Sequence, residues 1–225
     1  MRPLRTKLSV KETTDFFAAQ GITGPYFLFV GTLQPRKNVS TLITAFEQFM
    51  DEYAHSKETL STGSKRAQKK FAKEPQLVLA GKRGWLSEPL FAQIADSKYK
   101  KHIIVTGFIS DLEKKALIEN SQALLLLGLL EGFGIPALEA LHYGAVPIVA
   151  NSSSLPEVIG DAGYPVPPLD VQKISEALWS VFLLKARERA GLLKLGREQA
   201  QKFSWGKSAE IVLRVLQKTA AEAAQ

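Results

Sequence analysis

Cysteine is absent from the 225 residues of this chain, which excludes disulfide bonds and thiolate metal sites. Histidine is scarce, and the scattered His55, His102 and His142 form no zinc-ligand motif, so no protein-built metal site is expected. A run of 18 apolar residues and a signal-peptide pattern are also missing. We therefore expect an intracellular, cytoplasmic protein that folds by burying apolar side chains.

The composition is that of a soluble globular protein, with 45% apolar and 23% charged residues. The length suffices for one large or two small domains. The formal net charge of +7 leaves three kinds of partner open, namely nucleic acid, an anionic membrane surface and phosphorylated ligands.

Much of the positive charge lies between residues 55 and 75, where six Lys or Arg accompany two Glu. This stretch is rich in Ser, Thr and Gly and poor in apolar residues, which predicts a basic loop inserted between two elements. We favour a solvated loop; the alternative is peripheral contact with the inner face of a membrane or with a partner. Aromatic residues are not interleaved with the basic ones, so a nucleic-acid groove is not expected.

Apolar runs and helical periods alternate along the chain. The runs at residues 26–30, 76–80, 103–106, 123–127 and 146–150 predict strands. Nearly continuous apolar strands that alternate with helices indicate a parallel sheet covered on both faces. We therefore predict a doubly wound, Rossmann-like α/β domain over residues 25–225, preceded by a linker-like segment, residues 1–24, with a helix at 10–20. In this architecture, ligands bind outside the carboxyl ends of the strands.

Residues 131–139, directly after the apolar run that ends at Leu130, are the most informative stretch. Gly132 and Gly134 predict a sharp turn, and Pro136 suits the first turn of a helix. The free N–H groups of residues 133–135 at such a helix start favour an anion, typically phosphate. The acids that flank the turn, Glu131 and Glu139, suit sugar hydroxyls.

A second loop, residues 31–38, follows the first predicted strand. It places Arg36 and Lys37 at the start of a helix. Arginine offers phosphate a fork of donors and lysine a point charge. A basic solvated loop is the alternative.

The Glu131-to-Glu139 pattern, filled with Gly-Phe-Gly-Ile-Pro, resembles the donor-site motif of the retaining glycosyltransferases of family 4, which have the two-domain GT-B fold. The resemblance extends from about residue 26 to residue 170 and covers only the C-terminal, sugar-nucleotide half of such an enzyme. It implies transfer of a hexose from a UDP- or GDP-linked sugar, with retention, to a glycan or lipid-linked acceptor. An N-terminal domain, in the same full-length protein or on a separate chain, would carry the acceptor site.

The resemblance also implies roles for individual residues. Lys37, with Arg36, would hold and stabilise the leaving diphosphate, which would make a metal or other cofactor unnecessary. Glu139 would bind the ribose diol, and Glu131 the hydroxyls of the donor sugar.

The remaining donor-binding positions follow from the same resemblance. They are Gly31, Thr32, Phe108, Gly132, Phe133, Gly134 and Ile135. Backbone around Phe108 would meet the edge of the nucleobase; the alternative is that Phe108 is a core residue. The chain departs from the family at Thr32, where arginine is commonest, and at Leu127-Gly128, where relatives commonly carry Pro-Ser. The second departure removes a hydroxyl near the site.

Three other interpretations stay open on the sequence. The chain could be a non-catalytic partner subunit that needs a separate acceptor domain, or a fragment of a longer enzyme. A dinucleotide-dependent oxidoreductase is disfavoured, because no Gly-x-Gly-x-x-Gly follows residues 26–30.

Overall fold

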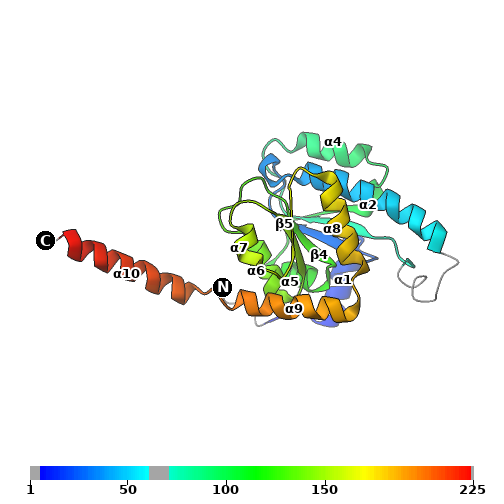
Figure 1. Cartoon of the computed structure of the whole chain (residues 1–225). Coiled ribbons are helices and arrows are strands. Elements are labelled where there is room, and N and C mark those ends of the chain that lie inside the picture. The colour runs from blue at the N-terminus through cyan, green and yellow to red at the C-terminus, as the bar shows by residue number, and fades with distance from the viewer. Residues whose placement is uncertain (1–5, 61–70, 224–225) are drawn as a thin grey trace.

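The computed structural model of the protein describes residues 6–60 and 71–223. A sheet lies at its centre (Figure 1). Its six strands have the order β3-β2-β1-β4-β5-β6, and all neighbouring strands are parallel. The strands are β1 (Tyr26–Val30), β2 (Gln76–Ala80), β3 (Ile103–Gly107), β4 (Ala123–Leu126), β5 (Val146–Ala150) and β6 (Tyr164–Val166). The predicted doubly wound, Rossmann-like α/β fold is thereby confirmed.

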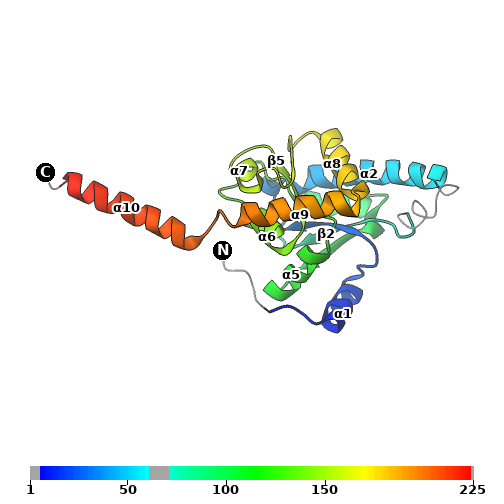
Figure 2. The ribbon, with the colours of Figure 1, turned by 60° about the horizontal axis from the view of Figure 1, so that its bottom comes forward.

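Helices cover both faces of this sheet (Figures 1 and 2). One face packs against α2 (Val39–Leu60), α4 (Glu88–Asp96) and α8 (Val171–Leu183). The opposite face packs against α1 (Val10–Gln20), α5 (Asp111–Asn120), α6 (Ile135–Tyr143) and α7 (Leu155–Ile159). Helix α9 (Ala186–Ala200) contacts α6 and α7.

The burial of strand β1 on both faces explains why its sequence is continuously apolar. Successive side chains of a strand point to opposite faces. Phe27 and Phe29 enter the core beneath α2 and α8, whereas Tyr26 and Leu28 enter the core on the other face. Both faces are buried, so no position of the strand is free to be polar.

The stretch expected to be a basic loop is partly helical. Helix α2 continues to Leu60, so residues 55–60 are helix, while residues 61–70 lie outside the described residues. A helical turn that does not pack against the core needs no apolar period. The polar composition of residues 55–60 therefore gave no indication of a helix. Beyond the undescribed residues the chain returns to the body, where the hydroxyl of Tyr53 donates to the carbonyl oxygen of Phe71 at 3.1 Å.

The linker-like N-terminal segment holds the helix predicted at residues 10–20. Ser9 and Glu12 form a reciprocal capping box at its start, and Gly21 ends it in the left-handed conformation, with φ 74°. Phe16 and Phe17 pack against the core of the second face, and α1 lies beside α5 (Figure 2). Helix α1 is therefore part of the folded body.

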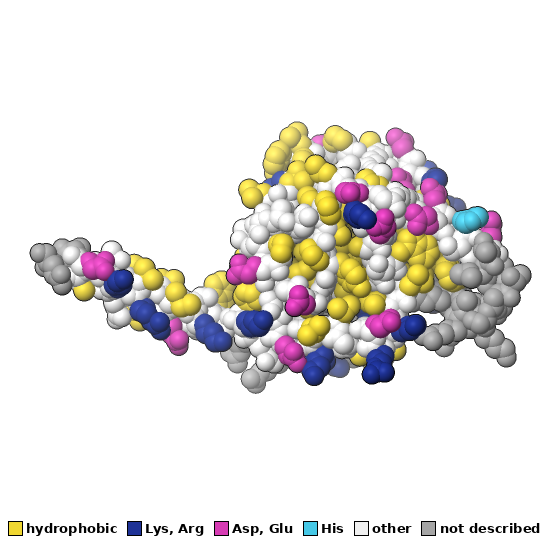
Figure 3. Space-filling view, in the orientation of Figure 1, with side chains coloured by type: hydrophobic (Ala, Val, Ile, Leu, Met, Phe, Trp, Pro, Cys, Tyr) yellow, Lys and Arg dark blue, Asp and Glu magenta, His cyan; other side chains and the backbone are white. Residues whose placement is uncertain are grey.

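The last helix, α10 (Trp205–Ala223), projects away from the body (Figures 1 and 2). Its apolar and basic side chains lie on different sides (Figure 3). Exposed apolar residues include Ile211, Leu213 and Leu216. Among the helices of the described ranges, none has both the length and the apolar character needed to cross a bilayer.

Candidate functional site

The carboxyl ends of β1 and β4 mark the point where the strand order reverses. These two strands are neighbours in the sheet although β2 and β3 separate them in the chain. The connections from β1 and β4 lead to helices on opposite faces, which leaves a crevice between their loops. The loop of residues 31–38 and the turn before α6 meet at this crevice.

The loop after β1 is tied to the segment after β4 by backbone and side-chain hydrogen bonds. The Leu129 N–H donates to the Arg36 carbonyl at 3.1 Å. Asn38 adopts a left-handed conformation, with φ 55°, and its Nδ2 donates to the carbonyls of Leu127 at 3.1 Å and Pro168 at 2.6 Å. These bonds fix the short 3-10 helix η1 (Pro35–Lys37) against the β4 loop.

Lys37 and Glu131, both predicted site residues, meet in this crevice. Lys37 Nζ lies 2.6 Å from Glu131 Oε1, and the two side chains are only 12% and 8% exposed. A pair so shielded from water interacts strongly but costs desolvation, so structural stability alone does not explain it. Arg36 lies exposed at the rim, with Nη1 3.5 Å from the Leu130 carbonyl oxygen.

The turn between Glu131 and α6 leaves backbone donors free. Gly134, with φ 92°, precedes the first helical residue, and no side chain caps this helix start. Within the described residues, the N–H groups of Phe133, Gly134 and Ile135 have no hydrogen-bond acceptor. These donors and the helix dipole favour an anion at this position.

Glu139, one turn further along α6, is also paired with a lysine. Lys114 Nζ donates to Glu139 Oε1 at 2.7 Å and lies 3.1 Å from Asp111 Oδ1. Desolvation alone would lower the pKa of Lys114, but hydrogen bonds and negative charge from Glu139 and Asp111 outweigh it and raise that pKa above the ordinary lysine value. The side chain of Glu139 is 5% exposed.

Lys114 was not among the site residues predicted from the sequence. The available signal was its position three residues after Asp111, at the start of a helix that follows a strand end. That spacing places both side chains on one face of α5. It does not reveal Glu139 as the partner, because Glu139 belongs to another helix.

Phe108 lies just beyond β3 and is 74% exposed, so the alternative that it is a core residue is wrong. The ammonium of Lys82 lies 4.8 Å from the centre of its ring. An exposed aromatic ring beside a cation, at the carboxyl edge of the sheet, offers a flat surface to a planar group.

Gly31 and Thr32 lie at the end of β1. Gly31 donates to the Ala80 carbonyl at 2.9 Å, and Thr32 is exposed. A Cβ on Gly81, at the end of β2, would lie 1.9 Å from the Gly31 carbonyl oxygen. The glycines thus allow the loops after β1 and β2 to approach each other closely.

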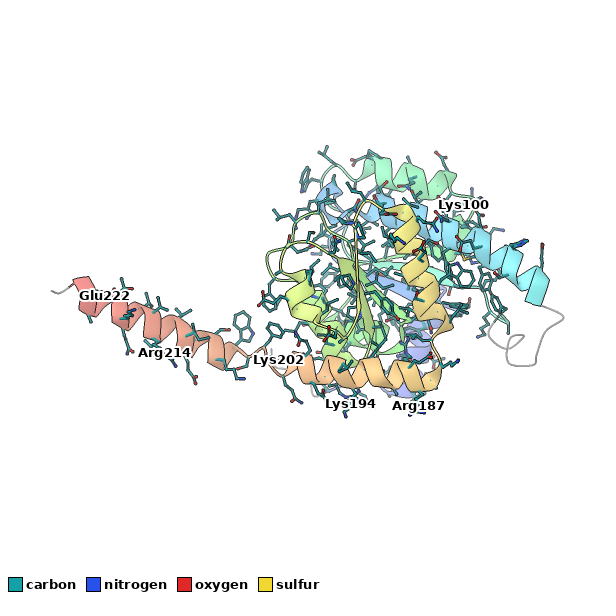
Figure 4. The ribbon with its side chains drawn as sticks, in the orientation of Figure 1. Lys100, Arg187, Lys194, Lys202, Arg214 and Glu222 are labelled. Carbon is teal, nitrogen blue, oxygen red and sulfur yellow. The ribbon has the colours of Figure 1, made fainter. Side chains whose placement is uncertain are left out.

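An apolar cavity of about 380 Å³ adjoins the turn before α6. It lies between Phe133 and Ile135 on one side and Phe203 and Trp205, at the junction of α9 and α10, on the other. Three basic side chains lie on a different surface, with Arg187 and Lys194 on the outer side of α9 and Lys202 in the turn that follows it (Figure 4). The described residues contain no group of three His, Asp or Glu side chains arranged to hold a metal ion.

Comparisons with known proteins agree with this architecture. The family described as glycosyl transferases group 1 matches residues 11–199. The O-antigen chain mannosyltransferase B of Escherichia coli is 32% identical over 181 residues, which are 80% of this chain and 42% of that protein. The GDP-mannose-dependent alpha-(1-6)-phosphatidylinositol dimannoside mannosyltransferase of Mycobacterium tuberculosis is 29% identical over 64% of this chain and 36% of its own length.

The solved structure of Anabaena Alr3699/HepE in complex with UDP and glucose superposes on 94% of this chain and 53% of its own length, with a TM-score of 0.72 and 16% identity. At that identity the likeness concerns the fold. The chain spans less than half the length of the two curated relatives.

Proposed function

The chain belongs to the glycosyl transferases group 1, and on this basis we propose that the carboxyl edge of its sheet binds a nucleoside diphosphate sugar. The hexose is transferred to a glycan or lipid-linked acceptor with retention at the anomeric carbon. The observation that carries the proposal is the meeting of Lys37 and Glu131 at the β1–β4 reversal, beside the uncapped start of α6.

The diphosphate occupies the space between Lys37 and the turn before α6. Lys37 supplies a charge at the floor of the crevice, Arg36 a second one at the rim, and Phe133, Gly134 and Ile135 supply backbone donors. As the bond to the sugar breaks, negative charge grows on the leaving phosphate. Fixed cations and N–H groups aimed at that charge stabilise the transition state without reorganising. We therefore propose that the reaction needs no metal ion.

The nucleoside lies along α6 and the loop after β3. The buried carboxylate of Glu139 accepts hydrogen bonds from the ribose hydroxyls, and Lys114 keeps it oriented. The base lies toward Phe108, where backbone groups meet its edge. Glu131, closer to the phosphate site, binds hydroxyls of the donor sugar.

The donor is a GDP- or UDP-linked hexose, and the two mannosyltransferase relatives favour a mannosyl group. The acceptor site belongs to an N-terminal domain. The chain covers only 42% of the mannosyltransferase B, so that protein has ample length for such a domain. Reactants held in register can contribute roughly 7–11 kcal/mol to a barrier, and a donor site alone does not hold the acceptor. We therefore expect donor binding by this chain and transfer only with the second domain.

Calorimetric titration of the purified chain with GDP, UDP, ADP, GDP-mannose and UDP-glucose tests the proposal. Binding of at least one guanosine or uridine diphosphate is expected. No heat with any of the five at millimolar concentration would refute donor binding. Rapid sugar transfer by the chain alone, measured with radiolabelled donors, would contradict the need for an acceptor domain. Unchanged binding with and without EDTA is the result expected of a metal-free site.

A further inference from the structure

Gly128, three residues before Glu131, provides the space that the Glu131 carboxylate fills. A Cβ at position 128 would lie 2.5 Å from Glu131 Oε1 and 3.2 Å from its Cδ. The backbone of Gly128 is not in the left-handed region, so its conformation does not demand glycine. What requires glycine here is the position of Glu131 against Lys37.

Lys37 and Glu131 are in contact although they have different roles in the proposed reaction. Lys37 is to hold the diphosphate and Glu131 the sugar hydroxyls, yet their side chains neutralise each other at 2.6 Å. In the described part of the chain, Glu131 is the acid paired with Lys37. An anion that reaches Lys37 must therefore compete with this carboxylate.

The backbone on both sides of the pair is held in place. Leu129 is bonded to Arg36, the Glu131 N–H faces the Ser153 hydroxyl at 3.4 Å, and Ser154 faces the Glu131 carbonyl oxygen at 3.5 Å. Release of Lys37 therefore needs only rotation of the Glu131 side chain, because the loops themselves are anchored.

We propose that Lys37 and Glu131 form a latch, which Gly128 makes possible and the donor's diphosphate opens. Phosphate oxygens replace the carboxylate on Lys37, and the freed Glu131 turns toward the sugar that arrives with them. Gly128 is thus a positioning residue that acts through Glu131. The inference rests on the proposed function for the role of the freed carboxylate, but the competition for Lys37 can be tested without a nucleotide.

The experiment is titration with inorganic pyrophosphate at fixed ionic strength. Glu131→Gln keeps the size of the side chain and removes its charge, so pyrophosphate should bind roughly 5- to 150-fold tighter, the usual range for a coupling between two sites. Gly128→Ala should also tighten binding while the carboxylate remains, because the new Cβ displaces it from Lys37. In a Lys37→Met background, Glu131→Gln should have no further effect.

Two controls separate the latch from general effects. Glu157→Gln removes an exposed charge from α7, and Gly191→Ala adds a Cβ to α9 with no atom within 4 Å; neither should tighten pyrophosphate binding. The latch is refuted if Glu131→Gln binds pyrophosphate no tighter than the unmodified chain, or if the gain persists without Lys37. Absence of pyrophosphate binding in every variant also refutes it. A latch confirmed with pyrophosphate, in a chain that shows no preference for nucleotides, would instead overturn the proposed donor.

Discussion

Lys114 donates a hydrogen bond of 2.7 Å to Glu139, so a side chain of α5 holds a carboxylate that belongs to α6. Lys37 and Glu131 make a similar pair at the turn before α6. The proposed donor site therefore contains two acids, each held by a lysine from a different element.

Glu139→Gln should weaken the binding of a nucleoside and of its diphosphate by the same factor. The loss should be about 1–3 kcal/mol, the range for a hydrogen bond to a charged group. Pyrophosphate binding should not change, because the ribose contact is not involved. Calorimetry with guanosine, GDP and pyrophosphate, or with the uridine series, measures the three values. Unchanged nucleoside binding would rule out the ribose assignment.

Lys114→Met should lower the stability of the fold in a pH-dependent manner. The folded pKa of Lys114 is raised, so its stabilising contribution is fully present below the unfolded value of 10.5 and is lost as pH rises through the folded value. The difference in free energy of unfolding between the two proteins should stay constant from about pH 7 to 10 and shrink above that range. Urea denaturation at each pH measures it, with Lys202→Met, in the exposed turn that follows α9, as the control. A difference that grows in alkali would contradict the assignment.

Lys37→Met should weaken GDP or UDP binding by about 1–3 kcal/mol and leave guanosine or uridine binding unchanged. The reason is that Lys37 faces the proposed phosphate site and not the nucleoside. Lys98→Met is the matched control, since Lys98 also pairs with an acid, Asp51 at 2.6 Å, but on an exposed surface. Equal losses for nucleoside and nucleotide would show that Lys37 acts on the fold instead.

Gly134→Ala should destabilise the protein by about 1–3 kcal/mol, because φ is 92° there and the new Cβ would lie 2.4 Å from Leu155 Cδ2. Gly132→Ala, two residues earlier, should change the stability by no more than about 0.5 kcal/mol, since its Cβ would meet no atom within 4 Å. Denaturant midpoints of the two variants give the comparison. Similar midpoints would mean that the turn relaxes at little cost.

The strands were predictable because a strand buried on both faces appears in the sequence as a continuous run of apolar residues. Residues 26–30, 76–80 and 146–150 were predicted as strands and have those bounds in the structure. The end of α2 was not predictable, because residues 55–60 are a polar stretch of helix with no apolar period to mark it. An apolar period arises where a helix packs against a core. It therefore cannot mark the end of a helix that extends beyond the core.

The candidate site was predictable in part, for a similar reason. Glycine spacing and the position of strand ends place Lys37 and Glu131 at one edge of the sheet, although their roles remain predictions. The partnership of Lys114 with Glu139 and the space that Gly128 provides depend on distances between separate elements. Such distances follow from packing angles, which single-chain patterns do not encode.

The adjacency of β1 and β4 has a consequence for how the chain is made. Lys37 and Glu131 are 94 positions apart, so at about 5–20 residues per second the ribosome needs roughly 5–20 seconds to supply the second after the first. During that interval β1, which lies between β2 and β4 in the finished sheet, has an open edge that other chains could pair with. A nascent chain is therefore most prone to misassociation before β4 has been synthesised. The pairing of β4 with β1 covers this edge and also completes the crevice.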